Sequence, residues 1–389
     1  MGIHVKMSNK SHRNDLTNTL CSVWPNLAEH RDKIYTYYIG PNSQPWDIFE
    51  ELPDDTFIKS INKQIDNGKN IIMLYNISEV ITKLTIDKLH KCLPYLNIDP
   101  SKIYHVTGAL DGPEQYEEYC KSKDYTERIT ILSANIFLKV LQEQNLSNVY
   151  TEYVPKVRLK KFLCFNRVAR VHRLSLMGNL IINDLLDTGY CSFYGNNYDN
   201  SWVDYIHFNK KLSTEIKYVL FKNKNLFPMH LTGNKLRRFN PIGIDLSDVP
   251  LFENSYYSIV TETYFYENSE NDPRASAMIP AIFFTEKIYK PISMRHPFIL
   301  VSRANSLKWL RKLGFKTFSP FINESYDDEM DDDNRMNLII EEIKRLNQLS
   351  ESEWLEWQQE IKAIVDYNFE LFISLHVYAF NPNKDLDFL

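Results

Sequence analysis

A short stretch that joins an apolar run to several charged groups is the clearest candidate for chemistry. Residues 283–292 read FFTEKIYKPI, so two phenylalanines lead directly into a threonine, a glutamate and a lysine. Thr285 is a good N-cap, which makes Glu286 and Lys287 the first residues of a predicted helix. A helix N-terminus that follows a strand binds phosphate, and Lys287 and Lys290 add positive charge to it. The stretch therefore predicts an anion site, although a simple Glu286 to Lys290 pair on a helix also fits it.

A second group of cations lies earlier in the chain. The segment 156–173, KVRLKKFLCFNRVARVHR, has the highest density of basic residues, and Arg167, Arg170 and Arg173 recur every three residues where a helix is predicted to begin. Cations at a helix N-terminus oppose the helix dipole unless an anion lies among them. Guanidinium groups bind a diphosphate through paired hydrogen bonds. The segment predicts either a diphosphate site or a surface helix start with solvated arginines.

Both segments resemble known glycosyltransferases. The run FFTEKIYKPISMRHPFILV resembles the nucleotide-sugar signature of GT-B glycosyltransferases of the fucosyltransferase type, where TEK follows an apolar run and opens a helix. The set FLCFNRVARVHR, SIVTETYF, FFTEKIYKPI, HPFILV, LGFKTF and FINESYD resembles more closely a family of glycosyltransferases of tailed phages and large DNA viruses. The resemblance covers residues 160–370 and is weak over the first 150. It implies a GT-B fold, with two Rossmann-like domains facing a cleft, and transfer of a sugar from a nucleotide-sugar to a hydroxyl group.

The same resemblance assigns roles to individual residues. It implies that Glu286 holds the ribose hydroxyls of a UDP- or GDP-sugar, that Lys287 holds its phosphates, and that Arg167 and Arg170 clamp the diphosphate without a metal. The remaining members of the expected donor-binding set are Asn166, Arg173, Thr285, Tyr289 and Lys290. A D-x-D motif, which marks metal-dependent glycosyltransferases of another architecture, occurs as DLD at 385–387. We attribute that motif to chance and expect no metal.

Three carboxylates at predicted strand ends are the catalytic candidates. An inverting transfer needs a base that deprotonates the acceptor hydroxyl. Glu79 in YNISEV and Asp111 in VTGALDG are candidates for this base, and Glu262 in VTETYF is placed to face the sugar. Each has a structural alternative, because acidic side chains in such loops often accept hydrogen bonds from the backbone. A retaining mechanism needs no such base.

The acceptor is less well defined than the donor. The phage resemblance points to 5-hydroxymethylcytosine in phage DNA, and such a base would be flipped out of the duplex. Lysines alternate with aromatic residues over 208–225, and basic residues recur at 234–239, which favours nucleic acid. The net charge of −5 argues against it. The alternatives are a glycan or lipid-linked acceptor, or a non-catalytic nucleic-acid-binding or virion protein on the same fold.

The elements that must position these residues alternate between strands and helices. Strands are predicted at 70–75, 102–108, 128–132, 162–165, 256–265 and 297–302, and helices at 85–96, 113–123, 135–144, 170–187, 306–315, 335–348 and 352–375. This alternation predicts parallel, doubly wound α/β sheets. Gly189 is expected to cap the helix 170–187, and Ser350 with Glu353 to form a capping box.

Two domains follow from the chain length of 389 residues. The basic segment 151–161 is the expected linker between an acceptor-side domain at 1–155 and a nucleotide-sugar-binding domain at 156–389, whose final helix is expected to pack back toward the first domain. The five cysteines are dispersed and form no CxxC pair, which favours a reducing compartment. With no apolar run of membrane-spanning length, we expect a cytoplasmic protein. The acidic run at 327–334 is expected to be a solvated loop or helix-start charge, with metal binding as the alternative.

Overall fold

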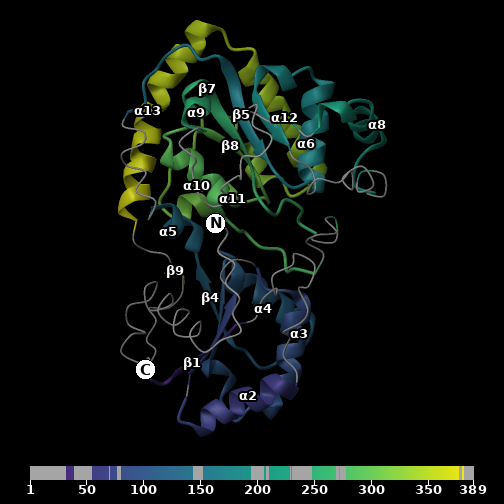
Figure 1. Ribbon diagram of the computed structural model, residues 1–389, viewed down its shortest axis with the longest axis vertical. Coiled ribbons are helices and arrows are strands. Elements are labelled where there is room, and N and C mark those ends of the chain that lie inside the picture. The colour runs from purple at the N-terminus through teal and green to yellow at the C-terminus, as the bar shows by residue number, and fades with distance from the viewer. Residues whose placement is uncertain are drawn as a thin grey trace. The chain divides into compact units, whose positions relative to one another are not determined.

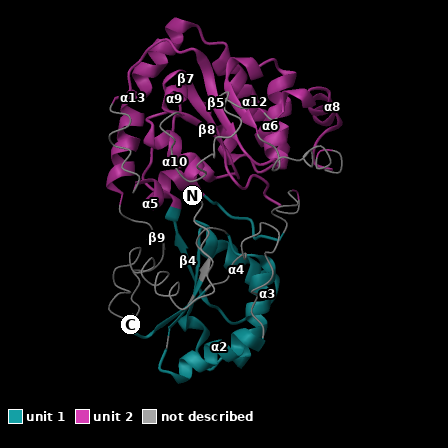
Figure 2. Ribbon diagram, viewed as in Figure 1, with its two compact units in different colours: residues 1–136, 277–283, 376–389 teal, residues 137–276, 284–375 magenta. Residues whose placement is uncertain are grey.

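The fold is α/β and contains two sheets. The computed structural model describes residues 32–38, 55–69, 71–76, 80–142, 152–193, 206, 210–227, 229, 248–268, 271, 277–375 and 379–380. The chain forms two compact units (Figure 2). Unit 1 comprises 1–136, 277–283 and 376–389, and unit 2 comprises 137–276 and 284–375. Each unit holds one sheet with parallel strands, which confirms the predicted fold class.

The sheet of unit 1 has the strand order β1-β2-β3-β4-β9. Its strands are β1 (Ile34–Tyr38), β2 (Ile71–Asn76), β3 (Ile103–Thr107), β4 (Thr130–Ala134) and β9 (Ala379–Phe380). The first four are parallel, whereas β9 is antiparallel to β4. The helices of this unit are α2 (Asp55–Asp66), α3 (Lys83–Cys92) and α4 (Gly112–Ser122), with 3-10 turns at Leu93–Tyr95 and Pro100–Lys102.

A segment from late in the chain belongs to unit 1 because its backbone bonds there. The amide of Lys83 donates to the carbonyl of Ala277 at 2.8 Å, and the amide of Leu110 donates to that of Ile282 at 2.8 Å. Ile279 packs with the apolar core between the sheet and its helices. Residues 277–283 are thus part of unit 1, although the residues on both sides of them in the sequence belong to unit 2.

The sheet of unit 2 has the order β6-β5-β7-β8, and all its pairs are parallel. Its strands are β5 (Lys160–Asn166), β6 (Tyr190–Phe193), β7 (Ser255–Thr261) and β8 (Phe298–Val301). From β5 the chain passes through α6 (Val171–Ile182) to β6 on one side, and it later returns as β7 on the other side of β5. The strand order therefore reverses between β5 and β7. In parallel α/β sheets, ligands bind at the carboxyl ends of strands at such a reversal.

Unit 2 contains further helices, most of which lie around its sheet (Figure 1). They are α5 (Ile136–Gln142), α8 (Thr214–Lys222), α9 (Val249–Glu253), α10 (Glu286–Ser293), α11 (Ser306–Lys312), α12 (Asp332–Asn347) and α13 (Glu351–Ser374), with 3-10 turns at Leu186–Thr188, Lys224–Leu226 and Ser325–Asp328. The predicted capping box opens α13, since Ser350 and Glu353 exchange both hydrogen bonds. Helix α13 contacts α10 within unit 2, and the chain then continues into unit 1 as β9.

Helix α6 ends earlier than predicted. It stops at Ile182, and Asp184 takes the left-handed conformation (φ 54°) that terminates it. Gly189 has φ −114°, so the prediction that it is the helix cap is wrong. A Cβ atom on Gly189 would lie 2.2 Å from Cε2 of Phe162. The glycine is therefore required by close packing against the Phe162 ring of β5.

The basic segment predicted as a linker packs into unit 2. Tyr153 is fully buried, and the Arg158 guanidinium donates to the carbonyls of Phe252 and Glu253 and to Oε1 of Gln358. The division between the two units falls after Ile136, earlier than the boundary at 155 that the composition suggested.

The acidic run at 327–334 serves helix starts. Asp331 accepts from the amides of Asp333 and Asn334 and caps α12, and Asp327 accepts from the amides of Leu307 and Lys308 in the first turn of α11. In the described ranges no group of three or more His, Cys, Asp or Glu side chains could hold a metal ion. No helix in that part of the chain has the length and apolar character needed to cross a membrane.

Candidate functional site

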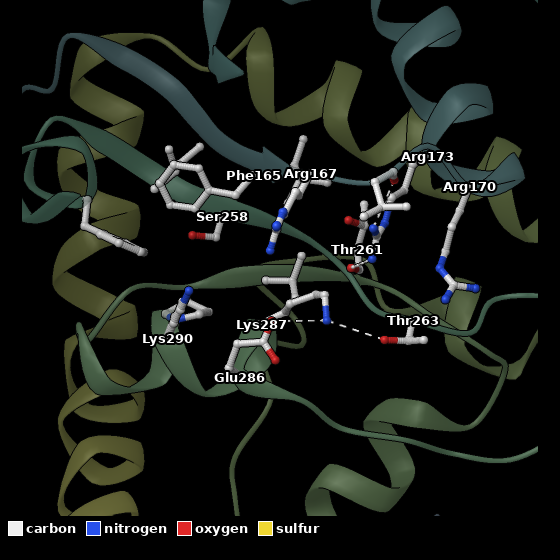
Figure 3. Close-up of a pocket in the computed structure, with 16 residues that line it drawn as sticks. Phe165, Arg167, Arg170, Arg173, Ser258, Thr261, Thr263, Glu286, Lys287 and Lys290 are labelled. Carbon is white, nitrogen blue, oxygen red and sulfur yellow. Dashed lines mark hydrogen bonds and ion pairs between the residues drawn. The ribbon is translucent and has the colours of Figure 1, made fainter. Parts of the chain in front are cut away.

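A pocket of about 250 Å³ lies in unit 2 at the strand-order reversal between β5 and β7 (Figure 3). Its wall has cationic, hydroxyl-bearing and apolar parts and a single carboxylate, that of Glu286. The cations are Arg167, Arg170, Arg173, Lys287 and Lys290; the hydroxyl groups belong to Ser258, Thr261 and Thr263. The apolar residues are Leu163, Phe165, Val168, Phe252, Ile259, Val260 and Pro291. Five cations against one carboxylate give the pocket a positive potential that favours an anion.

The pocket has a different character at its two ends. Figure 3 shows Phe165 and Ser258 toward one end, and Arg170 and Thr263 toward the other. Glu286 lies between these ends. An elongated ligand with a flat apolar group at one end and negative charge at the other therefore matches the wall.

Glu262 fixes the start of α10. Its side chain is fully buried, Oε1 accepts from the backbone amide of Thr285 at 3.1 Å, and Oε2 accepts from the Thr285 hydroxyl at 2.8 Å. Burial raises the pKa of Glu262, and the nearby ammonium of Lys287 partly offsets this. Thr285 caps α10 as predicted, since its hydroxyl accepts from the amide of Lys287. Because both Glu262 oxygens serve the backbone turn, the geometry favours the structural alternative for this residue.

Lys287 is held by several oxygen atoms while part of it remains accessible. Its Nζ lies 2.6 Å from Oγ1 of Thr285, 3.4 Å from Oγ1 of Thr263 and 3.3 Å from Oε1 of Glu286. A longer ion pair of 3.8 Å joins it to Glu262. The side chain is 27% exposed, so the ammonium is oriented at the pocket without being enclosed.

Glu286 and Lys290 lie one turn apart on α10 and both line the pocket. Burial alone would raise the pKa of Glu286, but the charges of Lys287 and Lys290 outweigh it and hold that pKa below its ordinary value. Burial lowers the pKa of Lys290 to about 8, against the opposing influence of Glu286. Glu286 is therefore an ionised carboxylate in a buried site, which can accept hydrogen bonds from hydroxyl groups of a ligand.

Arg167 and Arg170 bring guanidinium groups to the pocket from the segment between β5 and α6. Arg167 is exposed, and Arg170 is half-buried with its guanidinium 5.9 Å from the centre of the Tyr264 ring. Arg170 is the N-cap residue of α6, where positive charge is unfavourable without an anion, and Arg167 lies three residues before it. The structure thus brings the arginine group and the α10 group to one pocket wall.

Arg173 has a different environment, since it is buried behind the same wall. Its guanidinium donates to the backbone carbonyls of Val168, Thr261 and Glu262 at 3.2 Å each. His172 lies 3.0 Å from the carbonyl of Glu262, and burial lowers its pKa well below the ordinary value. The neutral imidazole can donate to that carbonyl, so both residues position the loops at the ends of β5 and β7.

The other predicted site residues lie away from the pocket wall or in the other unit. Asn166 is buried and joins the ends of β5 and β7, since its Oδ1 accepts from the Thr261 hydroxyl at 2.6 Å. Tyr289 is fully buried, with Phe315 and Phe372 as aromatic neighbours. Asp111 is buried in unit 1, where Oδ1 accepts from the amide of Ile282 at 2.6 Å. Glu79 lies outside the described residues.

Several residues of the pocket were not predicted from the sequence. Phe165 and Phe252 form part of the apolar wall, and Ser258 is a polar residue inside the fully buried strand β7. Thr263 binds Lys287. Nothing local distinguishes Ser258 from the other hydroxyl-bearing residues of β7, and nothing local marks a phenylalanine as part of a ligand wall.

Comparisons with known proteins give only distant likenesses. No protein-family model and no curated protein matches the sequence. Among solved structures, a UDP-forming α,α-trehalose-phosphate synthase from Burkholderia xenovorans is 9% identical, with a TM-score of 0.38, over 92% of this chain and 76% of that chain. The N-terminal domain of trehalose-6-phosphate phosphatase from Candida albicans is 9% identical, with a TM-score of 0.40, over 95% of this chain and 75% of that chain. The UDP-forming α,α-trehalose-phosphate synthase from Burkholderia vietnamiensis is 10% identical, with a TM-score of 0.38, over 93% of this chain and 77% of that chain. Likeness at this level carries no argument about the activity or the substrate.

Proposed function

We propose that this protein is a glycosyltransferase of the GT-B type that binds a nucleotide-sugar in the pocket at the carboxyl ends of β5 and β7. The observation that carries the proposal is the composition of this wall. Among the described residues, five cations and one ionised carboxylate line a pocket at the strand-order reversal of a parallel sheet, and Phe165 and Phe252 line one end of it together with Lys290 (Figure 3). A nucleoside diphosphate has a base, a ribose and two phosphates, which match the aromatic side chains, the carboxylate and the cations of this wall.

Each part of the donor has a proposed partner. The phenylalanines Phe165 and Phe252 would pack on the base, and Glu286 would accept hydrogen bonds from the ribose hydroxyls. Lys287 and Arg167 would bind the diphosphate, together with Arg170. When the bond between the sugar and the diphosphate breaks, negative charge develops on the leaving phosphate, and these fixed cations stabilise it.

We propose that the transfer does not depend on a divalent cation. In many sites a bound metal supplies the positive charge that stabilises a leaving diphosphate. Here Arg167, Arg170 and Lys287 supply that charge from the protein. Activity that is abolished by EDTA and restored by Mg²⁺ or Mn²⁺ would contradict this part of the proposal.

The catalytic base of an inverting transfer stays a choice between Glu79 and Asp111. Both belong to unit 1, which we propose as the acceptor-side unit. Glu262 is the weaker candidate, because both of its oxygens already accept hydrogen bonds from Thr285. We assign Glu262 the role of positioning α10.

We propose 5-hydroxymethylcytosine in DNA as the acceptor, with a glycan or lipid-linked hydroxyl as the alternative. One surface feature favours nucleic acid. On α8, Tyr218 is 63% exposed and Phe221 is 58% exposed, and the ammonium groups of Lys222 and Lys224 lie 6.0 and 5.0 Å from the centres of these two rings. Exposed rings beside lysines bind unpaired bases by stacking and phosphates by charge.

Two measurements test the proposal in sequence. A panel of nucleoside diphosphates should raise the melting temperature if the pocket binds a donor, and no shift with any of them would overturn the donor site. The protein should next be incubated with nucleotide-sugars and hydroxymethylated DNA, and the nucleosides should be weighed by mass spectrometry. A mass gain of one hexose or deoxyhexose is expected. Donor hydrolysis without a nucleoside mass gain would reject DNA and leave the glycan or lipid acceptor.

A further inference from the structure

Ser258 presents an unusual hydroxyl group at the apolar end of the pocket. It lies within β7, where every residue is buried, and its Oγ is 2.8 Å from Nδ1 of His296. The other ring nitrogen of His296, Nε2, is 2.8 Å from the backbone carbonyl of Ser255. A carbonyl oxygen can only accept a hydrogen bond, so Nε2 carries a proton and donates it.

This arrangement determines the direction of the hydrogen bond at Ser258. Burial lowers the pKa of His296 to about 3, aided by the positive charge of Arg158, so the ring is neutral and holds one proton. With that proton on Nε2, Nδ1 accepts and the Ser258 hydroxyl donates to it. The hydroxyl hydrogen of Ser258 is therefore used in the bond to His296, and toward a ligand the Ser258 oxygen can act only as a hydrogen-bond acceptor.

Lys290 supplies the complementary group at the same end (Figure 3). An ammonium offers three hydrogen-bond donors and no acceptor. Ser258 and Lys290 together thus provide one acceptor and several donors, beside the side chains of Phe165 and Phe252. A buried N–H group that finds no acceptor weakens the binding of its ligand.

Resting on the proposed function, we infer that Ser258, oriented by His296, accepts a hydrogen bond from the N3–H of a uracil base, which favours a uridine diphosphate sugar over donors built on adenine, cytosine or guanine. Uracil has one ring N–H between two carbonyl oxygens, which matches one acceptor and a cationic donor. The amino groups of adenine and cytosine each carry two N–H bonds, and guanine carries three on its pairing edge. Each of these bases leaves at least one N–H without an acceptor from Ser258.

The test compares nucleoside diphosphates by titration calorimetry. UDP should bind about 10-fold more tightly than GDP, CDP or ADP, which corresponds to one unmet hydrogen bond. N3-methyl-UDP should bind more weakly than UDP by a similar factor. Equal or tighter binding of another diphosphate would overturn the inference while leaving the donor site intact, whereas no binding of any diphosphate would overturn the proposed function itself.

Replacing Ser258, and separately a control serine of the same sheet, separates base recognition from folding. Ser258→Ala should lower the affinity for UDP about 3- to 10-fold. It should bind UDP and N3-methyl-UDP equally and should leave the affinity for pyrophosphate unchanged. The control Ser192→Ala makes the same chemical change at a buried serine of β6 in the same sheet, outside the pocket wall, and should retain the preference for UDP. Persistent discrimination against N3-methyl-UDP in Ser258→Ala would refute the assignment.

Discussion

Glu286 combines burial, ionisation and a place at the first turn of a helix, and these properties make its replacement informative. We expect Glu286→Ala to lower the affinity for UDP about 10- to 100-fold, because hydrogen bonds to a charged group contribute roughly 1.5–3 kcal/mol. Pyrophosphate should bind as well or better, since the variant removes the one carboxylate among the described residues of the wall. Titration calorimetry measures both ligands.

The control for Glu286 is Glu341→Ala on α12. Glu341 is exposed and pairs with Lys344, outside the pocket wall. This variant should bind UDP as the unmodified protein does. If Glu286→Ala binds UDP with unchanged affinity, Glu286 does not hold the ribose.

We expect Lys290 to make UDP binding depend on pH. With its pKa lowered to about 8, it loses its charge as the pH rises from 7 to 9, and the affinity for UDP should fall over that range. Lys290→Arg keeps a positive charge at all these pH values and should show a flatter profile. The measurement is the dissociation constant at several pH values. Identical profiles for the two proteins would exclude Lys290 as the titrating group.

The lowered pKa of Lys290 also makes the free energy of unfolding depend on pH. Between about pH 8 and 10.5 the unfolded chain holds a proton on Lys290 that the folded protein has released. The unfolded state then binds more protons, so this residue makes the free energy of unfolding rise with pH across that window.

Among the elements, α6 and the loop after it offer a stability prediction. Gly189→Ala places a Cβ atom 2.2 Å from the Phe162 ring and should lower the free energy of unfolding by about 1–3 kcal/mol. Asp184→Gly relieves a left-handed residue and should leave stability unchanged or raise it by roughly 1 kcal/mol. Urea denaturation measures both variants. A larger loss for Asp184→Gly than for Gly189→Ala would contradict this account of the loop.

Elements with a strong periodic pattern could be predicted from the sequence, and those defined by distant contacts could not. The apolar run at 71–76 and the amphipathic pattern of α12 and α13 are local signals, and the structure has these elements close to the predicted bounds. Strand β7 ends at Thr261, before the predicted 265, although Tyr264 and Phe265 remain buried. An apolar pattern reports burial, and it does not distinguish a strand from a loop that packs against one.

The charged residues of the candidate site could be predicted from the sequence, whereas the buried residues that support them could not. Arg167, Arg170, Glu286, Lys287 and Lys290 share one pocket wall, as their positions at predicted helix starts suggested. The buried support of that wall was not predictable, because the bonds from Arg173 and His172 to a carbonyl on another strand require knowledge of the sheet order.

At the scale of the whole molecule, net charge and local charge have opposite signs. The protein carries a net charge of −5, whereas α8 exposes lysines beside aromatic rings. We expect binding to single-stranded hydroxymethylated DNA that weakens steeply with salt. The double variant Tyr218→Ala/Phe221→Ala should lose about 10-fold or more in affinity, because stacking contributes roughly 1–3 kcal/mol per base. Fluorescence anisotropy at two salt concentrations measures this.

Two controls accompany the α8 variant. Tyr95→Ala removes an equally exposed ring, 67% accessible, from unit 1 and should bind DNA normally. The α8 variant should retain its melting-temperature shift with UDP, since Tyr218 and Phe221 lie outside the donor pocket. DNA affinity that is unchanged in the α8 variant would show that this surface is not used.

The path of the chain between β7 and α10 has a consequence for dissecting and engineering the molecule. Residues 277–283 belong to unit 1, and Glu286 follows only three residues later, so the chain passes between the units four times. No single proteolytic cut or gene truncation can yield unit 2 as one continuous fragment. A chimaera that imports the first unit of another protein must graft three separate segments, and one of these joints lies directly before α10, which carries Glu286, Lys287 and Lys290.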